Sequence, residues 1–484
     1  MASTVIPSVY SDPHFIGNRR VITHLMEWKY DDIGNECERF LGPYGYGGVQ
    51  VSPVNEHAIM DGRPWYERYQ PVSYVIQTRS GNEQQFRHMV QRCNRAGVRV
   101  YVDVVLNHMT GGQQGLGTAG NYFNGHEQQY PGVPFGPEHF NGPESCPTEN
   151  LEIIDWDNRY AGFRCDASTH MWPEDLQNIF SRLNNLNEEF FPSNSRPFIY
   201  HEIIYYGGGG INPNEYISLG RIIEFRFWKE ITNVFRGHNQ LKWLRNFGTE
   251  WGLIDSSDAF IMIDSHDLRV GHNGELGFNI NCFEPQLLKA ATAFMLAWNY
   301  GIPRILSSYR WKQIVKDGKD LNEWVGPPTD LFGNIISIKI NPDESWNNQY
   351  WMCEHRWKQI YNMVRFKSIV DDEPIINWWD NGDNQIAFSR GNRGFIAFNL
   401  QKTRLNNDDN GNADYDKNQL DLRKRLQTGL PAGTYCDIIS GDRDGNKCTG
   451  KSIIVDQNGW ANIYIGHNEL DVFFATHLEA KLTE

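Results

Sequence analysis

Four apolar segments of this sequence each end in a group of charged or polar side chains. The groups read Asp103-Val-Val-Leu-Asn107-His108, Gly162-Phe-Arg164-Cys-Asp166, Phe198-Ile-Tyr-His201-Glu202 and Phe260-Ile-Met-Ile-Asp264-Ser-His266-Asp267. Any one of these charges could be an ordinary strand-end group with a structural partner. Several carboxylates in one cleft, however, repel and desolvate one another, so their convergence would indicate a site of chemistry.

Clustered carboxylates are suited to breaking a glycosidic bond. That reaction needs one ionised carboxylate and one protonated carboxylic acid on either side of the glycosidic oxygen. A third carboxylate can hold sugar hydroxyls more tightly in the transition state. The chain also has 16 Trp, 22 Tyr and 26 Phe, together 13% of its residues. On composition alone these rings are either a large core or flat platforms for sugar rings.

The elements that must position these groups are short strands alternating with helices. We expect strands at 47–53, 98–106, 197–200, 222–225, 259–263 and 302–306, and helices at 84–96, 174–186 and 285–298. Such alternation predicts an α/β fold with a parallel sheet and helical crossovers. At this length the leading architecture is a (β/α)8 TIM barrel, whose catalytic residues lie at the carboxyl ends of its strands.

The chain divides into three regions by pattern. We expect the catalytic barrel at residues 1–108 and 162–384, and an irregular Gly-, Pro- and Asn-rich insertion at 109–161. Residues 385–484 predict a C-terminal antiparallel β-sandwich with Greek-key connections. Its polar loop at 406–417 reads as a solvated insertion rather than a metal site, because the regular ligand spacing of a calcium loop is missing.

Charge and hydropathy exclude several classes of function. Lys and Arg number 45 against 59 Asp and Glu, a formal net charge of −14. An acidic chain without a basic run predicts no nucleic-acid partner and no anionic-membrane partner. No apolar stretch is long enough to span a bilayer. The first residues lack a secretory signal profile, so either a signal has been removed or the protein stays inside the cell.

These segments, in this order, resemble the conserved regions of the α-amylases of glycoside hydrolase family 13. Further stretches resemble the animal branch, and most closely the mite digestive enzymes known as allergens. They are Trp65-Tyr66-Glu-Arg-Tyr69-Gln-Pro, His170-Met-Trp-Pro-Glu-Asp, Ser307-Ser-Tyr-Arg-Trp and Cys353-Glu-His-Arg-Trp. The resemblance implies a secreted, monomeric, endo-acting enzyme that cleaves α-1,4 bonds in starch, glycogen and maltodextrins with retention of configuration.

The resemblance also implies a role for individual residues. Asp166 would be the nucleophile, Glu202 the acid/base, and Asp267 the third carboxylate. Arg164 lies two residues before Asp166, so on a strand it shares the same face and would keep that carboxylate ionised. The implied substrate-binding residues are Trp65, Tyr66, Tyr69, His108, Arg164, His201 and His266.

The sequence departs from the family where calcium is expected. Asn107 and the carbonyl of His170 match two ligands, but the segment with an aspartate ligand before Gly162 is not found. Parallel strands ending near His108 and Asp166 need a crossover, normally a helix of about ten residues or more. Residues 109–161 show no helical period of that length. One crossover is therefore expected to be shortened, with one helix, part of its strand and one calcium ligand missing. Asp155 or Asp157 could replace that ligand.

A chloride site is implied by Arg164 and Arg304, although Ser265 stands where the family has Asn. The resemblance supports disulfides Cys37–Cys93 and Cys436–Cys448. The remaining cysteines have no assigned bond: Cys146, Cys165, Cys282 and Cys353. We interpret Cys165 as a core residue, because alternation points it away from Asp166.

Two other functions remain open at this point. The shortened crossover suggests a catalytically impaired homologue that binds α-glucans without turnover. The fold also serves transglycosylases, although the similarity to animal amylases along the whole chain argues against that activity.

Overall fold

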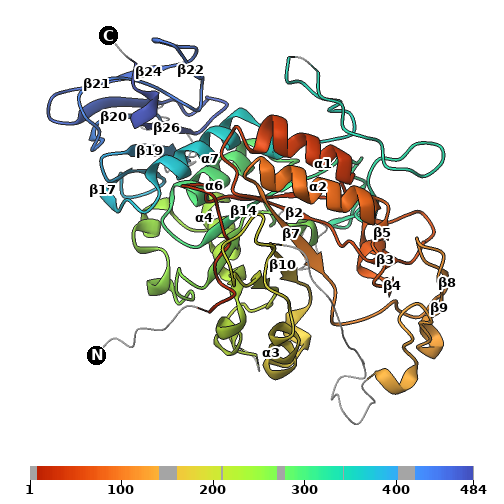
Figure 1. Cartoon of the computed structure of the whole chain (residues 1–484). Helices are drawn as coiled ribbons and strands as arrows, with labels where there is room; N and C mark the ends of the chain where they lie inside the picture. The colour runs from red at the N-terminus through yellow and green to blue at the C-terminus, as the bar shows by residue number, and fades with distance from the viewer. Residues whose placement is uncertain are drawn as a thin grey trace, which may run out of the picture.

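Eight parallel strands close into a barrel (Figure 1). The computed structural model describes residues 8–140, 161–208, 211–269, 278–341, 343–401 and 420–482. The barrel strands are β1 (Ile22–Leu25), β2 (Gly48–Val51), β7 (Arg99–Val104), β10 (Gly162–Cys165), β11 (Phe198–His201), β12 (Arg221–Ile223), β13 (Ala259–Met262) and β14 (Ile302–Ser307). They are hydrogen-bonded in chain order, and β14 closes on β1 with Ile22 opposite Arg304. The predicted barrel is confirmed.

Most of the barrel strands are buried throughout, as expected for a parallel sheet covered on both faces. In β7, the side chains of Val100 and Val102 belong to the core between the barrel and its helices. The side chain of Asp103 instead meets Arg164, which comes from β10. Alternation along each strand thus separates apolar packing from polar groups that gather within the barrel.

Helices follow most of the strands. They are α1 (Tyr30–Glu36), α2 (Glu83–Arg95), α3 (Pro173–Ser181), α4 (Phe225–Phe235), α5 (His266–Arg269), α6 (Pro285–Ala297) and α7 (Lys358–Val370). The start of α2 is set by a capping box between Asn82 and Gln85. The predicted disulfide Cys37–Cys93 ties α2 to the π-helical turn η1 (Cys37–Leu41) that follows α1. Within the described residues, no helix is both long and apolar enough to cross a membrane.

The connection from β7 to β10 is the unusual part of the barrel. Its described part, residues 105–140, contains β8 (Gln114–Leu116), β9 (Tyr122–Asn124) and two 3-10 turns, η3 (Gly125–Glu127) and η4 (Pro137–His139), but no α-helix. Residues 141–160, with Cys146, Asp155 and Asp157, lie outside the described residues.

The strand after this connection pairs over its whole length. All four residues of β10 pair with β7 on one side and β11 on the other. Residues 141–160 lie outside the described residues, so the expectation that part of this strand is missing stays a prediction. Its outer side chain Phe163 packs edge-on against Phe180 of α3, and Val100 and Val102 of β7 are fully buried. The neighbouring elements thus cover the apolar face of these strands.

Residues beyond α7 form antiparallel sheets, which confirms an all-β C-terminal domain (blue in Figure 1). One sheet has the order β17 (Ile375–Asp380), β18 (Gln385–Arg390), β19 (Gly394–Asn399) and β26 (Phe473–His477). The other strands of this domain form separate antiparallel pairs. These are β20 (Leu422–Gln427) with β25 (Trp460–Ile465), β21 (Gly433–Cys436) with β24 (Ser452–Val455), and β22 (Arg443–Asp444) with β23 (Lys447–Cys448). The predicted disulfide Cys436–Cys448 is present. Strand β17 begins before residue 385, and the loop 406–417 lies outside the described residues.

Shorter strands lie in the loops of the barrel. They are β3 (Glu56–His57), β4 (Pro71–Ser73), β5 (Gln77–Thr78), β6 (Gly81–Asn82), β15 (Val315–Lys316) and β16 (Lys319–Asp320). The 3-10 turn η2 (Trp65–Tyr69) lies between β3 and β4 and carries the aromatic motif noted in the sequence.

Candidate active site

The carboxyl ends of four barrel strands bring one arginine and four carboxylates together. Arg164 Nη1 donates to Asp103 Oδ1 at 2.7 Å and to Asp166 Oδ1 at 2.8 Å. Its Nη2 lies 2.5 Å from Glu202 Oε1 and 3.7 Å from Asp267 Oδ2. We call these five residues the mouth cluster. The three predicted catalytic carboxylates therefore lie around one guanidinium, at the mouth where barrel enzymes do their chemistry.

Asp103 is held from three sides. Besides Arg164, its carboxylate accepts hydrogen bonds from Tyr69 Oη at 2.9 Å and from Gln50 Nε2 at 3.1 Å. Gln50 also accepts from Tyr200 Oη at 2.8 Å. Sequence reasoning gave Gln50 no role. Gln50 is the single amide in the otherwise apolar strand β2. That pattern could have indicated a polar network, because a buried amide needs partners across the barrel.

The mouth cluster holds more negative groups than its one cation can neutralise. Burial raises the pKa of Asp166 well above its ordinary value; Arg164 opposes this shift, while Glu202, Asp103 and Asp267 add to it. Burial likewise raises the pKa of Asp267 to about 7, with the charge of Glu202 as the next cause. The cluster therefore retains protons near neutral pH, and these protons belong to the set rather than to one residue.

Glu202 is fixed by the turn that follows Asp166. Ala167 adopts a left-handed backbone with φ of 50°, which is uncommon outside glycine, and its N–H donates to Glu202 Oε2 at 2.9 Å. The backbone N–H of Thr169 donates to the Glu202 carbonyl at 3.2 Å. Backbone strain beside two reactive carboxylates is typical of a site whose geometry matters for function.

Aromatic rings form a wall beside the carboxylates. Tyr69 stacks on His266 with a centroid distance of 5.1 Å and an interplanar angle of 9°. Trp65 meets His266 edge-on at 5.5 Å and Tyr66 at 5.8 Å. His266 Nε2 lies 3.2 Å from Asp267 Oδ2. We call Trp65, Tyr66, Tyr69 and His266 the aromatic wall; only Tyr66 is substantially exposed, at 38%.

The two remaining predicted histidines lie in different places. His108 Nε2 is 3.0 Å from the Tyr69 carbonyl, so this ring is held against the backbone of the residue that contributes to the aromatic wall. His201 is fully buried, with Nδ1 3.0 Å from Ser168 Oγ and Nε2 3.3 Å from the Leu219 carbonyl. Alternation along β11 turns its ring away from Glu202, so the structure does not bring His201 into the mouth cluster.

Asn107 has a feature that suits a cation ligand. Its side chain is 3% exposed, and Oδ1 has no hydrogen-bond partner among the described residues. An unpartnered buried carbonyl oxygen fits a hard cation such as Ca²⁺. His170 lies exposed at the end of the turn after Asp166. No group of three or more His, Cys, Asp or Glu side chains in the described ranges is arranged to hold a metal.

Arg304 and Ser265 partly fit an anion. Arg304 is 1% exposed and donates through Nη1 to Gln50 Oε1 at 2.7 Å, while its Nε has no partner within the described part of the chain. Ser265 Oγ accepts from the Leu268 N–H at 3.2 Å, which leaves its hydroxyl hydrogen available. A buried unpaired N–H is a donor that a small anion could satisfy.

Cys165 and Cys353 are buried free thiols, and Cys282 is also buried. Burial raises the pKa of the Cys165 thiol to about 12, so it is not a nucleophile at neutral pH. The interpretation of Cys165 as a core residue is confirmed.

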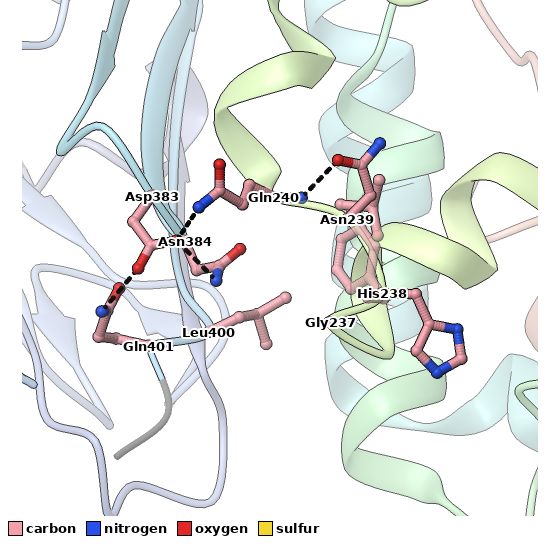
Figure 2. A pocket seen from close by; sticks show the side chains of 10 residues that line it. Gly237, His238, Asn239, Gln240, Asp383, Asn384, Leu400 and Gln401 are labelled. Atoms are coloured by element: carbon pink, nitrogen blue, oxygen red, sulfur yellow. Dashed lines mark hydrogen bonds between the residues drawn. The ribbon is translucent and has the colours of Figure 1, made fainter. Parts of the chain in front are cut away.

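A cavity of about 480 Å³ lies apart from the mouth cluster, between the end of α4 and the C-terminal domain. Figure 2 shows that Asp383 binds the amides of Gln240, Asn384 and Gln401. Since these polar groups satisfy one another across the seam between two domains, we assign the cavity to domain packing rather than to chemistry.

Known proteins resemble this chain over nearly its whole length. An α-amylase of Dermatophagoides pteronyssinus is 66% identical and an α-amylase of Acarus siro 52% identical; each match covers 98% of this chain, and 99% and 96% of the relative. The first match spans 509 positions, whereas 98% of 484 residues is about 474, so about 35 positions fall opposite gaps in this chain. That number agrees with a shortened segment.

Solved structures and a family model agree with the relatives. A point mutant of α-amylase I from Eisenia fetida, solved in complex with maltohexaose, superposes with a TM-score of 0.88 at 40% identity, covering 97% of this chain and 99% of that one. The C-terminal all-β domain of α-amylases matches residues 375–410 and 417–477. The chain is therefore a glycoside hydrolase by descent and belongs to the α-amylase family.

Proposed function

We propose that this protein is an endo-acting α-amylase that hydrolyses internal α-1,4 bonds of starch, glycogen and maltodextrins with retention of configuration. The observation that carries the proposal is the contact of Arg164 with both Asp166 and Glu202. One guanidinium touching both carboxylates supports the retaining arrangement, in which the two groups lie about 5 Å apart. We assign the barrel to residues 1–108 and 162–374, the insertion to 109–161 and the C-terminal domain to 375–484, because β17 pairs within the C-terminal sheet.

Asp166 acts as the nucleophile and Glu202 as the acid and base. Asp166 attacks the anomeric carbon while Glu202 gives its proton to the leaving glycosidic oxygen, and a covalent glycosyl ester forms. Glu202 then takes a proton from water, and the water oxygen displaces Asp166 from the sugar. Each displacement inverts the anomeric carbon, so the product keeps the α-configuration.

Arg164 couples the charges of the two steps. Asp166 must be ionised to attack, and Glu202 must be protonated to donate. Because Arg164 touches both, it can favour the anion on Asp166 when the proton resides on Glu202. Asp267, next to His266, holds sugar hydroxyls and stabilises the positive charge of the transition state.

The aromatic wall supplies flat apolar surface for glucose rings. Tyr66 offers the exposed ring, Trp65 packs edge-on against it, and Tyr69 and His266 stand beside Asp267. His108, held against the Tyr69 carbonyl, is a further substrate-binding residue. We assign His201 to positioning, since its ring anchors the end of β11 just before Glu202.

Ions would support the site from its edges. When calcium is bound, Asn107 Oδ1 and the His170 carbonyl would hold it, and the ion would tie the insertion to the barrel mouth. A chloride ion would be held by Arg164, Arg304 and Ser265 near the acid/base. Two disulfides fit an oxidising compartment, so we propose that the protein is secreted. We also propose that it is a monomer.

The test is release of reducing ends from soluble starch by the purified chain, with calcium and chloride supplied. We expect release in the native chain and its loss in Asp166→Asn, with cooperative melting unchanged. Release unaffected by Asp166→Asn would contradict the proposal.

The shortened β7–β10 connection favours one alternative: a homologue that binds α-glucans without turning them over. Starch binding by a cooperatively melting chain that releases no reducing ends would favour this alternative.

A further inference from the structure

A segment after β14 presents several large apolar side chains to water. We call residues 311–334 the rim segment. Its exposed apolar side chains are Ile314, Val315, Leu321, Trp324, Leu331 and Phe332. Of these, Leu331 is fully exposed and Phe332 is 89% exposed. Neither stabilises the fold by burial, and large apolar groups gathered at a surface are typical of binding sites.

The rim segment is joined directly to the aromatic wall. The Trp65 N–H donates to the Trp324 carbonyl at 3.3 Å, and Trp65 Nε1 donates to the Glu323 carbonyl at 3.1 Å. The ring of Trp324 lies against Gly62, where a methyl group would come within 2.9 Å of it. Trp324 is 41% exposed, so it adds an exposed ring next to Trp65 of the aromatic wall.

The turn that carries Leu331 and Phe332 is fixed by its own hydrogen bonds. Asp330 Oδ1 accepts from the N–H groups of Phe332 and Asn334, each at 2.9 Å. The Asp330 N–H donates to the Asn334 carbonyl at 2.9 Å, and Gly333 supplies the left-handed backbone with φ of 81°. The turn is preorganised, so a ligand would lose little free energy in ordering it.

The same turn lies next to the residues that precede the aromatic wall. A methyl group on Gly333 would lie 3.9 Å from Nη1 of Arg63, and Arg63 is followed in the chain by Pro64 and Trp65. Charge in the rim segment is mixed, with three Lys against four Asp and Glu. A mixed, apolar surface suits a neutral polymer better than an ion or a charged chain.

We propose that Trp324, Leu331 and Phe332 form an outer contact surface for an α-glucan chain whose scissile bond lies at the mouth cluster. This inference rests on the proposed function and names the form of substrate that it favours: long chains and the insoluble granule surface. The apolar faces of glucose rings beyond the aromatic wall contact these side chains, and the turn presents them without rearrangement.

The test compares two double variants that each remove one exposed aliphatic and one exposed aromatic side chain. Leu331→Ser with Phe332→Ser removes the proposed surface. Leu470→Ser with Trp243→Ser is the matched control, since these side chains are 88% and 54% exposed on other elements. Binding to insoluble starch granules is measured by co-sedimentation in an Asp166→Asn background, so that it does not depend on turnover.

We expect the Leu331/Phe332 variant to bind granules roughly three- to tenfold more weakly, and the control to bind like the parent. When Leu331→Ser and Phe332→Ser are made in the active enzyme, we expect the ratio of kcat/KM on long amylose to kcat/KM on maltopentaose to fall by a similar factor. The fall should come from a higher KM for amylose rather than from a lower kcat. Because binding is read without turnover, an inactive native chain would defeat the proposed function while leaving this test intact.

Three outcomes overturn the inference. Granule binding could be unchanged in the Leu331/Phe332 variant, or weakened equally in the control. Alternatively, the native chain could self-associate and the variant become monomeric, which would make a second copy of the chain the partner. Equal melting temperatures in all variants show that the folded state is being compared.

Discussion

Two buried charge clusters in this protein are balanced in opposite ways. In the mouth cluster one guanidinium, that of Arg164, serves four carboxylates. In the flank cluster, made of Glu36, Arg39, His355 and Arg356, one buried carboxylate serves several donors. Glu36 accepts from Arg356 Nε at 2.5 Å and Nη2 at 3.0 Å, and lies 2.9 Å from His355 Nε2.

The opposite balance gives opposite pKa shifts. Burial alone would raise the pKa of Glu36, but hydrogen bonds and charge from His355 and Arg356 outweigh it and lower the pKa to about 2. Burial raises the pKa of Asp267 to about 7, and Arg164 does not offset it. An excess of donors therefore marks a structural cluster, and an excess of carboxylates marks a site that can exchange protons.

The largest expected effect separates activity from stability in the mouth cluster. Asp166→Asn removes the nucleophile and one of the repelling carboxylates. We expect starch hydrolysis to fall roughly a thousandfold or more while the Tm stays the same or rises. Activity assays and thermal melts on the same preparation check both parts. A large fall in Tm would show that Asp166 is mainly structural.

The next largest expected effect is a loss of stability without a loss of activity. Glu36→Gln leaves the buried Arg356 guanidinium without its main counter-charge, which costs about 3–5 kcal/mol of unfolding free energy. We expect kcat per folded molecule to change little, because the flank cluster does not touch the substrate. Denaturant unfolding and active-site titration measure the two quantities. Loss of kcat with full stability would refute the distinction between the clusters.

The pH dependence of stability should differ in sign between the clusters. Asp267 keeps its proton up to about pH 7 in the folded chain but loses it near 3.8 when unfolded, so its contribution to stability falls as pH rises between these values. Its side chain is 34% exposed, so water moderates the effect. Glu36 has the opposite sign: its contribution is present above pH 4.5 and is lost as pH falls toward 2.

Melting curves from about pH 3 to about pH 7 test this pair of signs. The Tm of Asp267→Asn relative to the native chain should rise with pH across that range. The destabilisation caused by Glu36→Gln should shrink as the pH is lowered from 4.5. The same slope in both variants would mean that charge balance does not distinguish the clusters.

The smallest effect comes from the exposed member of the flank cluster. The side chain of Arg39 is 32% exposed and pairs with Glu36 from one helical turn away at 2.8 Å. Because Arg356 and His355 remain, Arg39→Gln should cost only about 0.5 kcal/mol. A loss as large as that of Glu36→Gln would show that the flank cluster fails as a unit.

Much of the barrel could be predicted because its strands and helices carry local signals. Helices α2 and α6 begin and end within one or two residues of the sequence prediction, since Asn82 caps one and Pro285 opens the other. Helix α4 was not predicted, although it begins at Phe225, where the predicted strand was to end. Its aromatic start fits either structure, and only packing against the barrel decides between them.

The contacts of the site were less predictable than its members. The sequence placed Asp166, Glu202 and Asp267 at the ends of strands, and the barrel brought them to one arginine. It also assigned His201 to the substrate, whereas its ring binds Ser168 and the Leu219 carbonyl. A residue next to a catalytic one along a strand faces the other way, so proximity in sequence is a poor guide to a shared site.

The sequence by itself determined which chemical groups this protein has and on which strand each stands, because strand periodicity and strand-end polarity are local properties. Only the tertiary structure decided the charge balance of each cluster, the link from Arg304 through Gln50 to Asp103, and the meeting of Trp324 with Trp65. Those depend on the closure of the barrel, which joins residues hundreds of positions apart. Since electrostatic energy depends on the distances between such groups, the chemistry of the mouth emerges only in the folded chain.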